Sequence, residues 1–520
     1  MKKFLFFLSL LFLVVAGQYW HEESVIAQQA QTCPTRPIAD SSNACATTAF
    51  VHNLFATLTP TGTVTSVASN NCISGGTITT TGTLGLTSSC ITDTYVNSLS
   101  ATKSLYTPSG TGGQAQTVAV RLGQAVYIGD YCSSSALSAN ATACFANAMT
   151  AACASTGAIY INKSAKFTGS ITAACDGLAL YFSSWNVVFT FANGSSYDFI
   201  SNGKRDLYIV NAHFVDSGKS GGTMWDIENS YNFIAIDTFS DNAYNGIYVN
   251  NCNTVEFRGG VLNLGSGSTF GVRLYAVPDG SHRTDVVQFW QFVIQANYVG
   301  ADGLQVDGDF NTLRWFGGSI LSANYAVLVQ NSGNSATHYP SALFFYGLEA
   351  DGEKNQSVLI QGGKNIEFIG GDLSNTSTAP TTGTPQGGLD GATFQCNADA
   401  AYSVTSNIKI TGTRISNSRV MAAYIDCKDV DIAGASFSDA SKAGVGAYVA
   451  VEFGPHADRI TWAGGSAGCR IGESCRVNYG IQVDSGGINM GIGLVAMVSL
   501  VGPYTCVGGC AGSVHIAPAF

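Results

Sequence analysis

The feature that most constrains this chain is a short unit that recurs through its second half. The segment Asn245–Gly260, NGIYVNNCNTVEFRGG, holds an alternating apolar pair, Ile247 and Val249, and then a polar bend. A second alternating pair, Val255 and Phe257, follows the bend and precedes two glycines. Apolar residues at a period of two predict short strands that bury one face. Most of the chain after residue 220 consists of variations on this unit.

From Ile247 onward the first apolar pair recurs at intervals of 23 to 34 residues, and a second pair follows most of its occurrences. The first pair recurs as Trp225/Ile227, Ile247/Val249, Val272/Leu274, Leu304/Val306, Val327/Val329, Val358/Ile360, Ala392/Phe394, Ala423/Ile425, Val449/Val451 and Ile481/Val483. The second pair recurs as Val255/Phe257, Val287/Phe289, Leu313/Trp315, Leu343/Phe345, Ile366/Phe368, Ile408/Ile410, Val430/Ile432 and Ile460/Trp462. An Asn or Asp often precedes the second pair, at Asn253, Asp285, Asn311, Asn365, Asn407, Asp429 and Asp458. A glycine usually follows it, at Gly259, Gly317, Gly347, Gly370, Gly412, Gly434 and Gly464.

The repeated unit predicts an all-β solenoid. Asn, Asp and Gly at fixed offsets supply left-handed or tightly bent backbone. Each unit is too short to bury its own apolar face, so successive units must stack, about 4.8 Å apart. We therefore expect a right-handed parallel β-helix. An antiparallel sandwich is the alternative, because it also produces evenly spaced short strands.

Composition narrows the class of partner. The 520 residues contain 11% charged residues and carry a net charge of −10, whereas soluble proteins usually have about 25% charged residues. The negative charge argues against a nucleic-acid partner and against an anionic membrane surface. A low-charge chain rich in glycine and threonine is typical of rigid extracellular fibres.

The N-terminus predicts export. Residues 1–16 combine two lysines with a short apolar run, which fits a secretory signal cleaved after Ala16 or Ala27. An uncleaved membrane anchor is the alternative reading. We expect the mature protein to be secreted or held at the cell surface, with no membrane contact after cleavage.

The 15 cysteines all follow this apolar run, so an oxidising compartment makes disulfides the expectation. Close neighbours that could pair are Cys33/Cys45, Cys72/Cys90, Cys132/Cys144, Cys153/Cys175, Cys469/Cys475 and Cys506/Cys510. Cys252, Cys396 and Cys427 lie inside predicted strands and are interpreted as buried thiols. A zinc site is a weaker reading, because the chain has no CxxC motif.

Two segments near the N-terminus resemble phage tail fibres. The run CPTRPIADSSNACATTAFVHNL is similar to a leader found in many tail-fibre proteins, and Gly62–Leu86 resembles their Thr/Gly-rich segments. The alternative is a plain Thr/Gly-rich linker. The resemblance implies a homo-oligomer, a trimer, held together through residues 33–115. It also suggests a division into a signal (1–27), a stalk (28–115), a β-helix (116–500) and a C-terminal cap or tail (501–520).

The start of the β-helix carries one predicted helix. Ala141–Ala154 places Phe145, Met149 and Ala152 on one face, and a strand over Ala158–Ile161 follows it. This order resembles the entry of pectate-lyase-like and tailspike-like β-helix proteins. The resemblance implies a capping helix that covers the open edge of the first coil.

Residues that alternate with the buried ones point outward and should form two columns. One predicted column is Asp226, Tyr248, Arg273, Gln305, Leu328, Leu359, Thr393, Tyr424, Ala450 and Gln482. The other is Glu228, Asn250, Tyr275, Asp307, Gln330, Gln361, Gln395, Asp426, Glu452 and Asp484. Amides, carboxylates and tyrosines at regular spacing suit a polysaccharide, which offers hydroxyls and apolar ring faces. We expect substrate binding by Asn250, Arg273, Tyr275, Gln305, Gln330 and Gln361. The alternative is an ordinary solvated face.

The candidate catalytic group is Asp302, Asp307 and Asp309, in ADGLQVDGDF. Glycoside hydrolysis uses two carboxyl groups about 5 to 9.5 Å apart. Asp307 and Asp309 would be about 6.6 Å apart on an extended strand, whereas Asp302 and Asp307 would be about 16 Å apart. Polygalacturonase-like enzymes use a similar cluster, but the rest of their signature is absent here. The alternative is aspartates that form turns beside glycine.

The sequence thus predicts a secreted, tailspike-like β-helix protein that binds polysaccharide. The first hypothesis includes cleavage of that glycan near Asp307, by a hydrolase or a lyase reaction. A non-catalytic adhesin or a structural fibre is the alternative. No cofactor is expected. Acidic ladders could hold Ca²⁺, but no dense Asp-x-Asp-x-Asp loop is present, and no metal site is predicted.

Overall fold

The computed structural model describes residues 126–517, except 193, 195–196, 219, 280–282, 297–299, 354, 375–391, 398–403, 419, 439–448, 470–476, 494, 500 and 508–513. Four two-residue strands are described nearer the N-terminus: β1 (Ile73–Ser74) pairs with β2 (Gly85–Leu86), and β3 (Leu105–Tyr106) pairs with β4 (Gln116–Thr117), both antiparallel. The chain divides into two compact units, Met1–Ser104 and Leu105–Phe520. The predicted signal and most of the predicted stalk lie outside the described residues.

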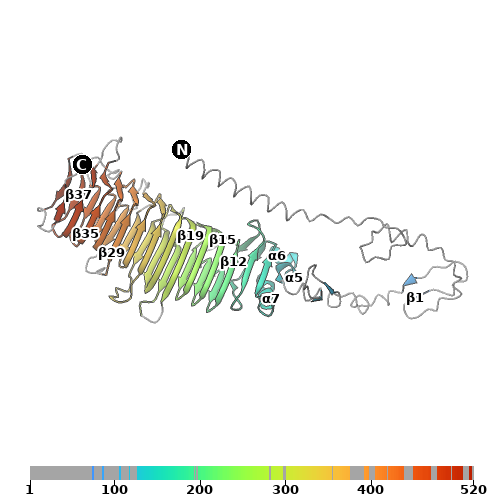
Figure 1. The fold of residues 1–520 in the computed structure, drawn as a ribbon. Coiled ribbons are helices and arrows are strands. Elements are labelled where there is room, and N and C mark those ends of the chain that lie inside the picture. The colour runs from blue at the N-terminus through green and yellow to red at the C-terminus, as the bar shows by residue number, and fades with distance from the viewer. Residues whose placement is uncertain are drawn as a thin grey trace, which may run out of the picture. The chain divides into compact units, whose positions relative to one another are not determined.

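The larger unit is a parallel β-helix, as predicted, and its coils follow one another along one axis (Figure 1). One side of each coil belongs to a 13-stranded sheet. Its strands are β8 (Ile171–Thr172), β11 (Phe199–Asn202), β14 (Trp225–Glu228), β16 (Ile247–Asn250), β18 (Phe270–Ala276), β20 (Asp302–Gly308), β22 (Tyr325–Gln330), β25 (Gln356–Gln361), β28 (Phe394–Asn397), β31 (Ala423–Asp426), β34 (Val451–Phe453), β37 (Tyr479–Val483) and β40 (Gly502–Cys506). Neighbouring strands pair in parallel, so the antiparallel sandwich is wrong.

The remaining sides of each coil form a 24-stranded sheet, also paired in parallel. Its strands are β5 (Val126–Tyr127), β6 (Ala158–Ile161), β7 (Ala165–Phe167), β9 (Ala179–Phe182), β10 (Val188–Phe191), β12 (Arg205–Val210), β13 (His213–Asp216), β15 (Tyr231–Ala243), β17 (Asn253–Leu264), β19 (Thr284–Gln295), β21 (Phe310–Leu321), β23 (Ser341–Tyr346), β24 (Glu349–Asp351), β26 (Lys364–Ile369), β27 (Asp372–Ser374), β29 (Ser406–Thr411), β30 (Arg414–Ser416), β32 (Lys428–Ala433), β33 (Ser436–Ser438), β35 (Asp458–Ala463), β36 (Ser466–Gly468), β38 (Ile488–Gly493), β39 (Ala496–Val498) and β41 (Val514–Ile516).

The second apolar pair keeps one register through the solenoid. Val255 lies opposite Val287, which lies opposite Leu313, and the column continues through each predicted coil to Ile460. These side chains are buried. The aromatic members stack inside the core, with the Phe257 and Phe289 ring centroids 5.5 Å apart. The core is therefore a set of apolar columns, in which each coil buries the face of the next.

The bends follow the predicted chemistry with one correction. All seven glycines after the second pair have positive φ, between 62° and 71°. Asn365, Asn407 and Asp429 have positive φ as expected, but at four coils the left-handed residue is the one after the Asn or Asp. Asp285, Asn311 and Asp458 instead supply side chains that bond between coils, as in the 3.1 Å bond from Asn311 Nδ2 to Asp285 Oδ1. The Asn253 side chain accepts a hydrogen bond from the neighbouring Thr254 hydroxyl.

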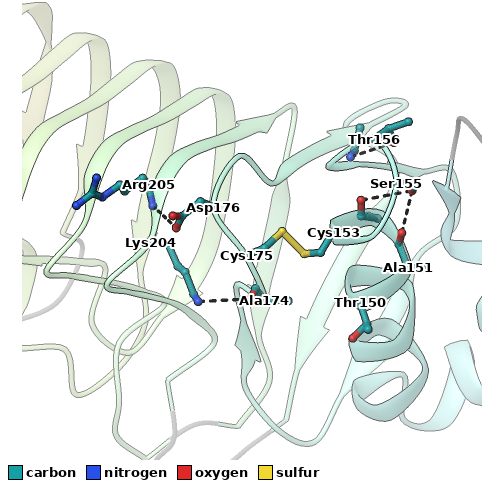
Figure 2. The surroundings of a disulfide bond; sticks show 12 residues. Thr150, Ala151, Cys153, Ser155, Thr156, Ala174, Cys175, Asp176, Lys204 and Arg205 are labelled. Carbon is teal, nitrogen blue, oxygen red and sulfur yellow. Dashed lines mark hydrogen bonds between the residues drawn. A yellow bond between two sulfur atoms is a disulfide. The ribbon is translucent and has the colours of Figure 1, made fainter.

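Three helices cover the N-terminal end of the solenoid: α5 (Ile128–Tyr131), α6 (Ser134–Ala139) and α7 (Thr142–Cys153). Helix α7 is the predicted capping helix, and it buries Phe145, Met149 and Ala152. The predicted Cys132–Cys144 disulfide ties α7 to the end of α5. The Cys153–Cys175 disulfide, also predicted, ties the last residue of α7 to the turn after β8 (Figure 2).

The interpretation of two strand cysteines as thiols is wrong. Cys396 and Cys427, from successive coils, form a disulfide, because parallel stacking places them close enough to bond. Cys252 is a buried free thiol, as expected. Burial raises the pKa of this thiol to about 12. Among the described residues, no helix is long and apolar enough to cross a membrane.

Candidate functional site: the outer face of the 13-stranded sheet

The outward side chains of the 13-stranded sheet form two columns. The first column is Asp226, Tyr248, Arg273, Gln305, Leu328, Leu359, Gln395, Tyr424, Glu452 and Gln482. In the second, Glu228, Asn250, Tyr275, Asp307, Gln330 and Gln361 follow in register. The six predicted substrate-binding residues thus occupy neighbouring positions on one face.

Two predicted coils are shifted by two residues. The inward pairs are Phe394/Cys396 and Val451/Phe453, not Ala392/Phe394 and Val449/Val451. Gln395 and Glu452 therefore belong to the first column, and Thr393 and Ala450 are buried. Alternation extends over three apolar positions in both segments, and the larger side chains, together with the Cys396 disulfide, occupy the core.

Asp307 lies between Tyr275 and Gln330, as predicted. Its side chain is 1% exposed. The Ser332 backbone N–H donates to Oδ1 at 3.0 Å, and the Ser332 hydroxyl donates to Oδ2 at 2.8 Å. Gln330 Nε2 also donates to Oδ2, at 3.2 Å. This carboxylate holds Gln330 and the loop after it in place, because all three donors converge on it.

Asp309 and Asp302 each have separate partners. Gly308 has a φ of 77°, so the chain turns before Asp309 and the extended spacing from Asp307 does not hold. Asp309 Oδ2 lies 2.8 Å from His338 Nδ1. The three aspartates thus do not share one open site, and their assignment to catalysis stays a prediction.

Asp302 lies at the start of β20. Its carboxylate accepts hydrogen bonds from Gln305 Nε2 at 2.6 Å and from Asn324 Nδ2 at 3.0 Å. Burial raises the pKa of this carboxyl above its usual value. The bond to Asp302 also fixes the Gln305 side chain, one of the predicted substrate-binding groups.

One acidic pair lies toward the N-terminal end of the face, at Asp226 and Glu228. Burial, and then the charge of Glu228, raise the pKa of Asp226 to about 7. The next coil places Tyr248 and Asn250 beside them, and burial raises the pKa of Tyr248 to about 12. One coil further, Arg273 Cζ lies 5.4 Å from the centre of the Tyr275 ring. This part of the face combines aromatic surface with hydrogen-bonding groups.

A second acidic pair lies toward the C-terminal end, where Glu452 and Asp484 come from successive coils. Burial, and then the charge of Asp484, raise the pKa of Glu452 to about 7. Gln482 Nε2 donates to Asp484 Oδ1 at 3.2 Å. Both acids are half-buried, so solvent reaches them.

Two further side chains border this pair. Burial, and then the charge of Asp426, raise the pKa of the Tyr424 phenol. Asp426 Oδ2 lies 2.9 Å from His456 Nδ1. Sequence reasoning did not single out the Glu452–Asp484 pair, although two acids on neighbouring coils were a visible signal. Among the described residues, no cluster of three or more His, Cys, Asp or Glu could hold a metal ion.

No protein-family model matches the chain, and no curated protein matches it in sequence. Among solved structures, tailspike protein 3 of bacteriophage CBA120 has a TM-score of 0.57 at 12% identity, over 83% of this chain and 68% of that chain. A mutant tailspike of E. coli bacteriophage HK620, in complex with a hexasaccharide, has a TM-score of 0.42 at 13% identity, over 81% and 72%. The GH87 α-1,3-glucanase catalytic unit from Streptomyces thermodiastaticus has a TM-score of 0.41 at 12% identity, over 74% and 68%. The first of these confirms the tailspike-like β-helix fold.

Proposed function

We propose that this tailspike-like protein binds a polysaccharide along the outer face of its 13-stranded sheet. The observation that supports the proposal is the register that aligns Asn250, Tyr275, Asp307 and Gln330 on consecutive coils. Coils about 4.8 Å apart offer a regular row of amides and aromatic rings to a polymer that itself repeats. Gln361 extends the same row, and Arg273 and Gln305 lie beside it in the other column.

Binding tests this proposal directly. The full chain is run in native gels that contain capsular polysaccharides or pectin, and retardation reports affinity. Tyr275→Ala and Gln330→Ala should weaken retardation, because each removes a group from the middle of the row. Glu349→Gln, on a strand of the other sheet, is the control and should bind as the wild type does. Equal retardation of all variants would place the binding site elsewhere.

A second candidate function is hydrolysis of the bound glycan at the Glu452–Asp484 pair. A general acid with a pKa near neutrality keeps its proton for the leaving group, while a nearby carboxylate acts as nucleophile or base. Glu452 meets the first requirement, and Gln482 orients Asp484. The two carboxyl groups are close enough to interact electrostatically, so we propose the shorter carboxyl spacing of a retaining mechanism, with Asp484 as nucleophile.

New reducing ends measure this activity. Asp484→Asn and Glu452→Gln should abolish their release while leaving glycan retardation intact. Absorbance at 235 nm without a dependence on Asp484 would indicate a lyase instead. Binding without any new ends would make the protein a non-catalytic adhesin. Asp307→Asn should weaken binding through Gln330 rather than stop the chemistry, and loss of turnover with unchanged binding would assign catalysis to Asp307.

We further propose that the protein is secreted and assembles as a trimer through residues 33–115. The support is the apolar N-terminal run, the resemblance of residues 33–100 to tail fibres and the disulfides of the solenoid. Light scattering of the secreted full chain should give three times the chain mass. A monomer would contradict the assembly, and retention in the cytosol would contradict export.

A further inference from the structure

The outer face of the 24-stranded sheet carries an aromatic stack that the proposed function does not use. Trp290, Phe316 and Tyr346 occupy one outward position on successive coils. The ring centroids of Trp290 and Phe316 are 4.0 Å apart, and those of Phe316 and Tyr346 are 5.0 Å apart. The rings are nearly parallel, so the two neighbours of Phe316 cover both of its faces. Only the end members, Trp290 and Tyr346, offer a ring face. Trp290 is 39% exposed.

The stack ends at Trp290 because the preceding coil supplies Arg258 in its place. The Arg258 side chain turns back along its own strand to Glu256. Its Nε lies 2.8 Å from Oε1 and its Nη2 lies 2.9 Å from Oε2. Among the described residues, Arg258 makes no cation–π contact with Trp290. A groove of about 810 Å³ opens there, with Trp290, Arg258 and Ile236 in its lining. Small-molecule sites have volumes of about 300–1,000 Å³.

Polar groups line the same groove beside the indole. Asp237 and Gln291 both have positive φ, 50° and 49°, and they alternate along the bend with Gly259 and Gly317. A Cβ on Gly259 would collide with the Asp237 carboxylate, so the glycine makes room for that side chain. Both polar side chains are exposed. In the part of the chain that the structure describes, neither of them makes a hydrogen bond, and Arg258 Nη1 has no acceptor.

We infer that this groove binds a pyranose ring of a neutral polysaccharide, at a site separate from the row on the 13-stranded sheet. A sugar ring is apolar on its C–H face and polar at its edge, which matches one open indole face bordered by a carboxylate, an amide and a guanidinium. Asp237, Glu256 and Arg258 carry a net charge of −1, so the groove selects against acidic sugars. The inference shares the ligand class of the proposed function but requires neither that row nor any cleavage.

Affinity electrophoresis of the full chain tests the site, with dextran, galactomannan and xyloglucan as neutral probes and polygalacturonate as the acidic one. We expect retardation by a neutral polymer, and Trp290→Ala should raise its Kd about tenfold or more, as loss of a central aromatic anchor does. Trp290→Phe should keep much of the affinity. Trp185→Ala is the matched control, because Trp185 is also an exposed tryptophan, at 53%, but lies outside the groove.

Four results would overturn the inference: no retardation by any neutral polymer, retardation by polygalacturonate alone, equal affinity of the Trp290→Ala and wild-type chains, or a change of mass in light scattering that makes the groove an interface between copies. Tyr275→Ala separates the two sites. If that variant alone loses binding, the groove fails and the proposed function stands. If Trp290→Ala alone loses binding, the groove stands and the proposed row fails.

Discussion

Glu452 and Asp484 lie near each other on two successive coils, and burial, followed by the charge of Asp484, raises the pKa of Glu452 to about 7, well above its usual value. The folded state therefore keeps a proton that the unfolded chain loses above about pH 4.5. The contribution of Glu452 to stability falls as pH rises from about 4.5 to about 7. The Glu452→Gln variant should thus be more stable, relative to the wild type, at pH 8 than at pH 4. This difference in the free energy of unfolding should change by about 1 kcal/mol between the two pH values, after allowance for solvent screening.

Urea unfolding of both chains at the two pH values measures this difference. Glu349→Gln, an exposed carboxyl on another strand, serves as the control and should show no such change. A Glu452→Gln stability difference that is the same at pH 4 and pH 8 would contradict the raised pKa.

The Cys396–Cys427 disulfide closes a loop with a sequence separation of 31 residues between successive coils. Replacing both cysteines by serine should lower the free energy of unfolding by about 3 kcal/mol, because the unfolded chain gains loop entropy. Thermal unfolding followed by circular dichroism measures the loss. Reduction with a thiol should not destabilise the double variant at this site any further. Cys252→Ala, at a buried free thiol, is the comparison without a cross-link.

Gly318 and Gly347 separate two costs of replacing glycine, since both have positive φ, 84° and 65°. A Cβ at Gly347 meets no atom within 4 Å, so Gly347→Ala should cost only the left-handed backbone term, about 1–2 kcal/mol. A Cβ at Gly318 would collide with the Phe292 carbonyl oxygen, so Gly318→Ala should cost clearly more. Equal losses in urea unfolding would show that the coils move apart freely.

Phe145 anchors the capping helix. It is fully buried and packs edge-on against Phe167 and Phe189, at ring-centroid distances of 5.7 and 5.4 Å. Phe145→Ala should cost about 3–5 kcal/mol, with increased hydrogen exchange first in β5 and β6. Tyr131→Ala, at an exposed aromatic of α5, should leave exchange in these strands unchanged. Uniform exchange along the solenoid after Phe145→Ala would argue against a separate cap.

The sequence predicts the second apolar pair at every coil from Val255 to Ile460 because bend residues fix its phase on both sides. The first pair has no such markers near Phe394 and Val451. Their segments alternate over three apolar positions, and side-chain volume and a disulfide decide which two face inward. The sequence thus predicts which residues of a strand face inward where bend-forming residues flank that strand, and not where they are missing.

The candidate site shows a similar division. Columns of outward residues follow from alternation alone, so Arg273, Tyr275 and Gln330 are placed correctly. The hydrogen bonds that bury Asp307 depend on Ser332, in a turn that periodicity does not describe. In the sequence, a second aromatic residue follows the inward one in QFW, RWF and FFY, and this pattern indicates the stack beside the Trp290 groove. The open end of the groove depends on the direction that the Arg258 side chain takes, which the pattern does not predict.

The Cys153–Cys175 disulfide limits how the N-terminal end of the solenoid can associate with other chains. A parallel coil stack ends in unsatisfied backbone groups that would recruit another chain, and repeated recruitment would build a filament. The covalent tether holds the end of α7 to the turn after β8, so we expect it to oppose head-to-tail polymerisation from this end for as long as the surroundings stay oxidising.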